Sequence, residues 1–275
     1  MIIHGKEISG EINNKIKKEI EKLRRRSRKR PFLFMFSFKE DSDVYVKNIA
    51  KTCENLGIVG NAKIIQKPNE KRLIDSINEL NVNRNIHGIL IHRPLPIPED
   101  NILNSISPEK DVYGVHSSYT YNLLGKKTLG PVTPLAVLKI LDKLNIDLKG
   151  KHAVIVNRSK FIGRPLAQML LQRDATVTIC HSKTHRLGDY TSQADILITA
   201  AGEPSLITSD MVKENSVVID VAMTLVDNRW KGDVDFDNVK DKVLAITPVP
   251  GGVGPVTISM IMENTLKAFK NQLNL

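Results

Sequence analysis

The segment Ala153-Val-Ile-Val-Asn-Arg-Ser-Lys-Phe-Ile-Gly-Arg-Pro165 combines an apolar run with a polar turn. The apolar run suits a buried strand, and Pro165 suits the first turn of a helix that follows it. Backbone N–H groups at such a turn bind phosphate, and Gly163 allows the backbone to approach a ligand closely. The segment therefore predicts a phosphate-binding strand–turn–helix unit, although its spacing differs from the usual G-x-G-x-x-G.

The next predicted strand, 176–179, ends in Cys180-His-Ser-Lys-Thr184. In a doubly wound sheet, the end of the second strand contacts the ribose 2′ position, where a carboxylate is typical of NAD binding. Here Ser182 and Lys183 offer hydrogen-bond donors and a positive charge, and no carboxylate is present. Arg158 adds a guanidinium that suits a phosphate. The pattern favours NADP over NAD, with an ordinary polar loop as the alternative.

Strands and helices alternate along most of the sequence. Apolar runs predict strands over 32–38, 62–65, 88–91, 153–156, 176–179, 196–199, 217–221 and 243–246. Helical periodicity and end signals predict helices over 8–23, 42–56, 70–80, 135–144, 165–172 and 256–272. This alternation predicts parallel sheets that are covered by helices on both faces.

The composition is that of a globular protein of about two domains. The chain has 275 residues, 41% of them hydrophobic, and a formal net charge of +10. The apolar runs are of strand length, far from the roughly 18 residues of a membrane span. Two cysteines, Cys53 and Cys180, cannot form a disulfide framework. The charged N-terminus does not resemble a signal peptide. We therefore expect a soluble cytoplasmic protein.

Basic residues are concentrated in the stretch Lys22-Leu-Arg-Arg-Arg-Ser-Arg-Lys-Arg30. A patch for nucleic acid or another polyanion is one interpretation. A solvated helix end is the other, because cations are favourable near the C-terminal end of the helix dipole. No nucleic-acid-binding motif accompanies the stretch, so we expect neither a nucleic-acid nor a membrane partner.

Seven segments together resemble one enzyme family, the FolD-type methylenetetrahydrofolate dehydrogenase/cyclohydrolases. In the C-terminal half they are Asn157-Arg-Ser-Lys-Phe-Ile-Gly-Arg-Pro165, Thr176-Val-Thr-Ile-Cys-His-Ser-Lys-Thr184, Val218-Ile-Asp-Val221 and Thr247-Pro-Val-Pro-Gly-Gly-Val-Gly-Pro-Val-Thr257. In the N-terminal half they are Ser42-Asp-Val-Tyr-Val46, Gly88-Ile-Leu-Ile-His-Arg-Pro-Leu-Pro96 and Ser107-Pro-Glu-Lys-Asp-Val-Tyr-Gly114. They follow the family's order and extend over essentially the whole chain.

The resemblance implies an α/β protein with two α/β domains around a cleft. Residues 1–134 together with 263–275 would form the folate-side catalytic domain, and residues 135–262 a Rossmann-like, doubly wound NADP-binding domain. Family members are usually homodimers. They oxidise 5,10-methylenetetrahydrofolate by hydride transfer to NADP, and many then hydrolyse the methenyl product to 10-formyltetrahydrofolate.

The resemblance also implies a set of site residues. The cofactor would be bound by Asn157, Arg158, Ser159, Ile162, Gly163, Pro165, His181, Ser182, Thr184, Gly202 and Met223. The substrate would be bound by His92, Tyr113, Pro250, Gly251 and Gly252, and the catalytic positions are Tyr45 and Ile49.

The catalytic helix departs from the family pattern Tyr-x-x-x-Lys. Tyr45 matches the tyrosine, but Ile49 occupies the lysine position. Lys47 and Lys51 lie two and six residues beyond Tyr45, at angles of about 200° and 240° around a helix, so neither replaces that lysine on the tyrosine's face. Isoleucine can neither donate a proton nor carry a charge, and hydrolysis requires an activated water and proton transfer.

Two further polar positions differ. His92 stands where the family usually has glutamine, and Tyr113 where it usually has an aspartate that accepts hydrogen bonds from the pterin ring. Asn157 replaces the first glycine of the G-R-S motif. A histidine at a strand end is often just a polar surface residue, and a tyrosine such as Tyr45 is often a half-buried aromatic. Their motif positions favour contact with the substrate.

These residues predict an NADP-dependent methylenetetrahydrofolate dehydrogenase with weak or absent cyclohydrolase activity. Hydride transfer depends mainly on holding the two reacting carbons close and aligned, which does not require a lysine at position 49. Three alternatives remain open: a fully bifunctional enzyme, a non-catalytic NADP(H)-binding relative, and a dehydrogenase of a non-standard substrate.

Overall fold

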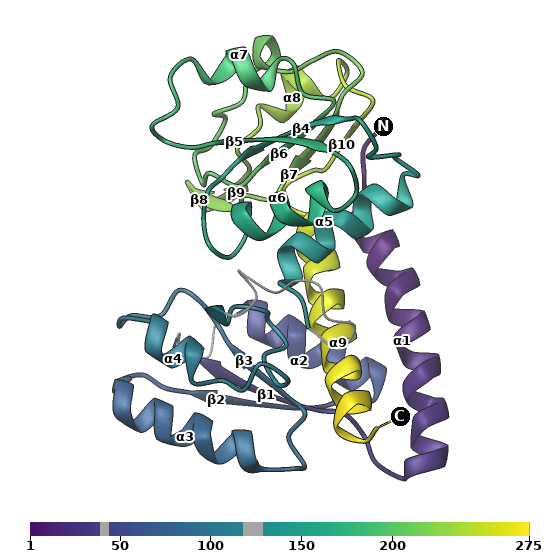
Figure 1. The fold of residues 1–275 in the computed structure, drawn as a ribbon, viewed down its shortest axis with the longest axis vertical. Helices are drawn as coiled ribbons and strands as arrows, with labels where there is room; N and C mark the ends of the chain where they lie inside the picture. The colour runs from purple at the N-terminus through teal and green to yellow at the C-terminus, as the bar shows by residue number, and fades with distance from the viewer. Residues whose placement is uncertain (39–43, 118–128, 275) are drawn as a thin grey trace. The chain divides into compact units, whose positions relative to one another are not determined.

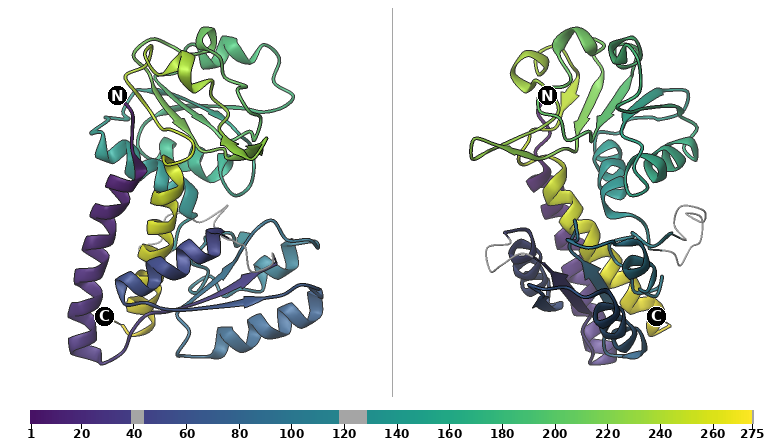
Figure 2. Two further views of the ribbon diagram at one scale, coloured as in Figure 1. Left: turned by 180° about the vertical axis from the view of Figure 1, so that it is seen from behind. Right: turned by 90° about the vertical axis from the view of Figure 1, so that its left-hand side faces the viewer.

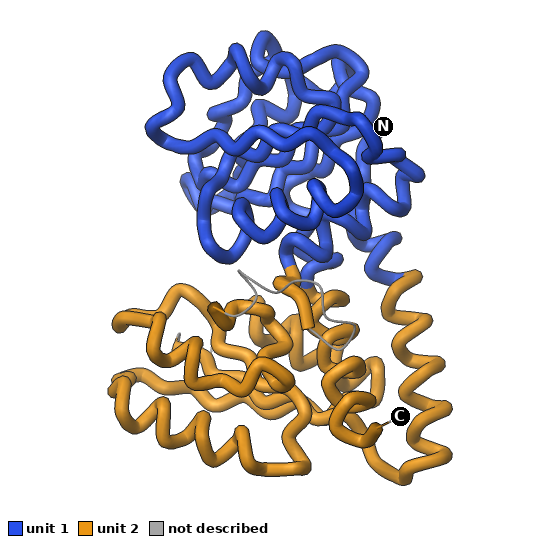
Figure 3. Tube along the Cα trace, in the orientation of Figure 1, with its two compact units in different colours: residues 1–10, 133–257 blue, residues 11–132, 258–275 orange. Residues whose placement is uncertain are grey.

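The computed structural model describes residues 1–38, 44–117 and 129–274. They form two compact units, shown in Figure 3. Unit 1 consists of Met1–Gly10 and Thr133–Thr257, and unit 2 of Glu11–Val132 and Ile258–Leu275. Within the described ranges, no helix is both long and apolar enough to span a membrane.

Unit 1 is built on a parallel sheet of five strands in the order β10-β7-β6-β4-β5 (Figure 1). The strands are β4 (His152–Val156), β5 (Thr176–Cys180), β6 (Ile196–Thr199), β7 (Val217–Asp220) and β10 (Ala245–Ile246). The helices are α5 (Val132–Lys143), α6 (Gly163–Leu171), α7 (Leu187–Thr191) and α8 (Phe236–Val239), with a 3-10 turn at Ser209–Met211. Helices lie on both sides of the sheet (Figure 2), as the alternating pattern predicts.

The central strands of unit 1 are apolar because both faces of the sheet are covered. Every residue of β6 and β7 is buried. Val154, Leu197, Val218 and Ile246 belong to one core cluster. An antiparallel hairpin, β8 (Thr224–Val226) and β9 (Arg229–Lys231), extends from the unit (Figure 2).

Unit 2 contains a parallel sheet in the order β2-β1-β3. Its strands are β1 (Phe32–Ser37), β2 (Val59–Ile64) and β3 (Gly88–Ile91), and its helices include α2 (Val44–Leu56), α3 (Glu70–Val82) and α4 (Asp100–Asn104). Two long helices, α1 (Gly5–Ser27) and α9 (Val253–Gln272), begin in unit 1 and end in unit 2. They lie side by side in unit 2, where Lys270 Nζ is 2.7 Å from Glu19 Oε1.

The amphipathic pattern of α1 explains its packing. Ile8, Ile16, Ile20 and Leu23 recur at helical spacing and are buried, while the basic residues of its last turn are exposed. The helix ends at Ser27, where Arg28 takes up a left-handed φ of +56°, and Pro31 lies beyond this end.

The expected elements are present, with differences at their ends. The expected strands 62–65 and 243–246 are β2, which begins at Val59, and β10, which covers only Ala245–Ile246. Helix α6 begins at Gly163, before Pro165, because the N–H of Leu166 donates to the carbonyl of Ile162. The expected start of a helix at 42 lies outside the described residues, as do Ser42 and Asp43 of the quoted motif.

The compact units differ from the expected domain limits at the N-terminus. Residues 1–10 pack in unit 1, whereas the expected folate-side domain begins at residue 1. Main-chain hydrogen bonds hold this segment, among them Ile3 N–H to Ile246 O, Ile246 N–H to Met1 O, and Gly5 N–H to Gly251 O. The first residues thus extend the edge of unit 1 beside β10, where Ile2 forms a parallel bridge with Ile246.

Candidate functional site

The carboxyl edge of the unit 1 sheet contains a topological switch point. Strand β4 lies between β5 and β6. The strand that follows β4 in sequence is therefore on one side of it, and the strand after that is on the other side. Ligands of open α/β sheets bind outside the carboxyl ends of strands at such a point. Asn157 follows β4 and Ala200 follows β6, and the Asn157 side-chain amide donates to Ala200 O at 2.7 Å. This single side chain therefore links the two strand ends that define the switch point.

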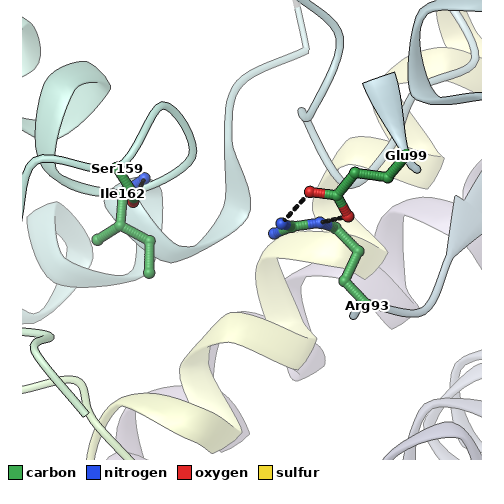
Figure 4. Close-up of polar contacts among 4 residues, drawn as sticks. All are labelled: Arg93, Glu99, Ser159 and Ile162. Atoms are coloured by element: carbon green, nitrogen blue, oxygen red, sulfur yellow. Dashed lines mark hydrogen bonds and ion pairs between the residues drawn. The ribbon is translucent and has the colours of Figure 1, made fainter. Parts of the chain in front are cut away.

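Asn157 also organises the turn between β4 and α6. Its Oδ1 accepts the N–H of Ser159 at 2.8 Å and that of Gly163 at 3.0 Å. Ser159 Oγ accepts the N–H of Ile162 at 3.1 Å (Figure 4). A Cβ on Gly163 would lie 2.0 Å from Asn157 O, so only glycine fits there.

The turn uses its backbone differently from the sequence prediction. Three of its N–H groups already donate within the turn, so the backbone is less available to phosphate than the pattern predicts. The side chain of Arg158 is exposed, and its carbonyl accepts from Arg164 Nε at 3.2 Å. The turn therefore offers a ligand an exposed guanidinium at the start of helix α6.

A second turn, residues 181–184, follows β5. His181 N–H donates to Thr184 Oγ1 at 2.9 Å, and Lys183 N–H donates to His181 Nδ1 at 3.1 Å. Ser182 and Lys183 are exposed on this closed turn. Because Val156 pairs with Cys180, the turns after β4 and β5 leave neighbouring strand ends. The structure thus brings Arg158 and Ser182 to the same edge of the sheet.

The remaining site residues that the sequence predicts in unit 1 lie in loops that connect the elements of this unit. Gly202 has a φ of +77° and open space around its Cβ position, so its conformation rather than crowding favours glycine. Its carbonyl accepts from Thr224 Oγ1 at 3.2 Å, and Met223 is 54% exposed. Pro250, Gly251 and Gly252, expected on the substrate side, precede α9, and Gly251 O accepts the N–H of Gly5 at 2.9 Å.

In unit 2, three residues from distant parts of the sequence form one aromatic cluster. The rings of Tyr45 and His92 stack with centroids 5.2 Å apart and an interplanar angle of 26°. Tyr113 shares a hydrogen bond with Tyr45. Burial raises the pKa of the Tyr113 phenol, while that hydrogen bond and the charge of Arg93 partly lower it. The tyrosine at the catalytic position thus contacts both residues that depart from the family pattern.

A buried carboxylate supports the loop that carries Tyr113. Asp111 accepts the N–H groups of Gly114, Val115 and His116 at 3.0, 2.7 and 2.7 Å. Burial raises the pKa of Asp111 to about 6, against the opposing effect of these hydrogen bonds. Because three backbone N–H groups donate to this one side chain, the backbone of the loop is held in place.

Ile49 belongs to the packed face of α2. It is fully buried, and it shares this face with Val46, Cys53 and Leu56. Lys47 and Lys51 are exposed, in agreement with their helical angles. Position 49 therefore supplies an apolar packing group and no proton donor.

Two features, one in each unit, are absent from the sequence prediction. Arg93 and Glu99 form a bidentate ion pair, with Nε–Oε2 at 2.8 Å and Nη2–Oε1 at 2.6 Å (Figure 4). An arginine within the apolar, proline-rich run after β3 was the available signal. In unit 1, Asp220 and Asp233 are buried carboxylates beside the loops described above. The donors to Asp233 lie 30 to 34 residues away in sequence, so spacing alone does not reveal them.

Comparison with known families gives matches over both halves of the chain. Residues 3–113 match the catalytic domain of tetrahydrofolate dehydrogenase/cyclohydrolase, and residues 131–273 match its NAD(P)-binding domain. The chain is 43% identical over 274 residues to the bifunctional protein FolD of Caldanaerobacter subterraneus subsp. tengcongensis, with 98% of this chain and 97% of the relative covered.

Two solved structures are similar along the full length. A 5,10-methylenetetrahydrofolate dehydrogenase from the silkworm Bombyx mori superposes with a TM-score of 0.94 at 37% identity. The methylenetetrahydrofolate dehydrogenase-cyclohydrolase (FolD) of Trypanosoma brucei, complexed with NADP and an inhibitor, gives 0.94 at 31% identity. Each comparison covers 100% of this chain and 99% of the other.

Proposed function

This chain belongs to the tetrahydrofolate dehydrogenase/cyclohydrolase family, and we propose that it is an NADP-dependent 5,10-methylenetetrahydrofolate dehydrogenase of one-carbon metabolism. The match of both family domains along one chain carries this proposal. The folate-side catalytic domain would be residues 1–134 with 263–275, apart from the N-terminal segment that packs in unit 1. Residues 135–262 would be the NADP-binding domain. A homodimer is part of the proposal and is tested by light scattering.

The residues after β4 and β5 fit NADP. Arg158, Ser182 and Lys183 follow the ends of neighbouring strands, and their side chains are exposed. These side chains can donate hydrogen bonds to a 2′-phosphate. No carboxylate follows β5, where one would bind the ribose hydroxyls of NAD. The Trypanosoma brucei relative, which contains NADP, supports the same choice. When bound, the cofactor would supply the hydride acceptor, and Asn157 would hold together the ends of β4 and β6 that border the cofactor site.

On the folate side, Tyr45, His92 and Tyr113 are the proposed substrate contacts in unit 2. Their mutual contacts fix the orientation of each ring, which is what positioning a flat substrate ring requires. Pro250, Gly251 and Gly252, which precede α9, are further proposed substrate contacts.

We further propose that cyclohydrolase activity is weak or lost. Hydrolysis of the methenyl bridge needs proton transfer to and from an activated water, and the fully buried Ile49 supplies neither charge nor proton. The second candidate is a fully bifunctional enzyme. Two observations favour it: the 43% identity to a bifunctional FolD protein, and the imidazole of His92 stacked on Tyr45, because histidine is the side chain most often used for acid–base catalysis.

A single assay separates these functions. The purified chain is supplied with methylenetetrahydrofolate and either NADP or NAD, and NADPH formation is recorded separately from decay of the methenyl product. We expect NADPH formation and slow methenyl decay. NADP binding without folate-dependent NADPH formation would instead indicate a non-catalytic relative. If NADPH forms only with another reduced substrate, the substrate is non-standard.

Two variants test the role of position 49. Ile49→Lys should raise the rate of methenyl hydrolysis, and Ile49→Met is the apolar control of similar length. Because a lysine here enters a packed face, dehydrogenase activity measured in parallel reports whether the variant is folded. Rapid hydrolysis by the unmodified chain would contradict the loss of this activity and favour the bifunctional enzyme.

A further inference from the structure

Unit 1 contains two buried aspartates whose partners are loops at the carboxyl edge of its sheet. Asp220 is the last residue of β7, and Asp233 follows the β8–β9 hairpin. Asp220 is 3% exposed and Asp233 is fully buried. Burying a carboxylate costs free energy unless hydrogen bonds compensate for the lost water, so the donors around each one indicate what it stabilises.

Asp233 holds the loop after β6 through three donors. Its Oδ2 accepts from Thr199 Oγ1 at 2.6 Å and from the N–H of Ala201 at 2.6 Å, and its Oδ1 accepts the N–H of Glu203 at 2.8 Å. Residues 201–203 are exposed, and they include Gly202 with its left-handed φ and open surroundings. A buried charge therefore fixes an exposed stretch of backbone from beneath.

The same loop is connected to the switch point. Ala200, beside the anchored residues, accepts the amide of Asn157 at 2.7 Å. The loop position set by Asp233 therefore also sets the position of the acceptor that Asn157 uses to bridge β4 and β6.

Asp220 fixes the next loop and the turn that carries Asp233. One of its oxygens accepts the N–H of Ala222 at 3.1 Å, and the other accepts the N–H of Val234 at 2.9 Å. A Cβ on Gly232 would lie 2.1 Å from Asp220 Oδ2, so the turn passes directly over the carboxyl group. Ala222 precedes the exposed Met223, and Thr224 Oγ1 donates to Gly202 O, which connects the two loops.

The proximity of two carboxyl groups has an electrostatic consequence. Burial, and secondarily the charge of Asp233, raise the pKa of Asp220 to about 7. An apolar pair would fill this volume without that cost, but it would leave the loop N–H groups without acceptors. The two carboxyl groups therefore act as hydrogen-bond acceptors that hold the loops in place, and not as side chains that fill the core.

We propose that Asp233 and Asp220 are positioning residues for the dinucleotide cofactor, holding the 200–203 loop and the 222–224 segment in their cofactor-binding conformation. The inference rests on the proposed NADP function. Neither side chain need touch the cofactor, because both are buried beneath the backbone that would contact it.

Asp233→Asn is the principal test. The amide retains size and one acceptor, but its NH₂ group faces backbone N–H donors and cannot replace the second acceptor oxygen. We expect KM and Kd for NADP to rise at least about tenfold, with kcat at saturating NADP within about twofold of wild type. Hydrogen exchange at the 200–203 amides should accelerate. Asp235→Asn is the matched control, because it makes the same change two residues away, where Asp235 accepts from Asn238 Nδ2.

The outcomes separate this inference from others. A lower melting temperature with unchanged KM and Kd would assign the residues a merely structural role and overturn the proposal, as would equal effects of the two Asn variants. If Asp233→Asn does not fold, Thr199→Val removes one donor and keeps the carboxylate, and should raise Kd about threefold. Calorimetric titration measures the Kd for NADP directly, even if the wild type does not oxidise methylenetetrahydrofolate. Failure of the proposed reaction is therefore distinguishable from failure of the positioning proposal.

Discussion

Replacement of His87 by asparagine should remove a pH dependence from the stability of unit 2. His87 is 3% exposed, and its Nδ1 accepts the N–H of Phe32 at 3.1 Å. Its ring packs edge-on against Phe269, with centroids 4.8 Å apart. Burial, with the nearby charges of Lys110 and Lys29, lowers the pKa of His87 to about 4. The neutral imidazole is therefore the form that the fold accommodates.

The magnitude follows from the difference in pKa between the two states. A histidine in the unfolded chain takes up a proton as the pH falls through about 6.5, whereas His87 in the fold does so only near 4. Between these values the unfolded state binds more protons, so the free energy of unfolding falls as the pH decreases. Between about pH 7.5 and about pH 5, this linkage removes about 2 kcal/mol of stability.

The assay is urea unfolding followed by far-UV circular dichroism at the two pH values, for the wild type and for His87→Asn. Hydrogen exchange at the β1 amides reports unit 2 separately from unit 1. The asparagine Oδ1 can take the place of Nδ1 as acceptor but does not titrate in this range. Burial raises the pKa of Asp111 to about 6, which acts in the opposite direction in both proteins, so the difference between them isolates His87.

His185→Asn serves as control, because it makes the same substitution at an exposed histidine of unit 1 and does not alter unit 2. If the wild type and His87→Asn lost the same stability over this pH interval, within about 0.5 kcal/mol, the linkage assigned to His87 would be refuted.

Three further substitutions test particular contacts. Gly163→Ala should abolish NADP binding in a calorimetric titration, because its Cβ would lie 2.0 Å from Asn157 O, whereas Gly254→Ala, whose Cβ meets nothing within 4 Å, should bind normally. Arg158→Ala should raise KM for NADP about tenfold and leave KM for NAD unchanged, as steady-state kinetics would show; an equal rise for both cofactors would contradict a 2′-phosphate contact. Lys110→Met should lower the free energy of unfolding by about 1–3 kcal/mol in urea titrations, because Lys110 Nζ caps two carbonyls at the end of α3 at 2.8 Å; unchanged stability would contradict that cap.

Local sequence patterns predicted most strands and helices but missed the β8–β9 hairpin. Its turn residues, Asp227 and Asn228, both have positive φ, which is the conformation of a two-residue hairpin turn. That dipeptide was a usable signal, although the flanking strands are only three residues long and largely exposed. Short exposed strands lack the apolar pattern on which the prediction depends.

The end of the first helix illustrates a different limit. The basic stretch that begins at Lys22 predicts a charged surface, and its charged side chains are exposed in the structure. It precedes β1, so it lies at the amino edge of the unit 2 sheet, whereas Tyr45 and His92 lie toward the carboxyl edge. Charge alone did not indicate which edge carries the candidate site, because that depends on the direction of the strands.

The sequence by itself determined the alternation of strands and helices, the turn after β4 and the apolar character of position 49. These depend on local propensity and on the chemistry of single side chains. Only the tertiary structure decided that Tyr45, His92 and Tyr113 form one cluster, and that Asp233 supports the loop containing Gly202. Parallel strands gather loops from distant parts of the chain at one edge, so contacts among those loops depend on strand order and packing, which local patterns do not encode.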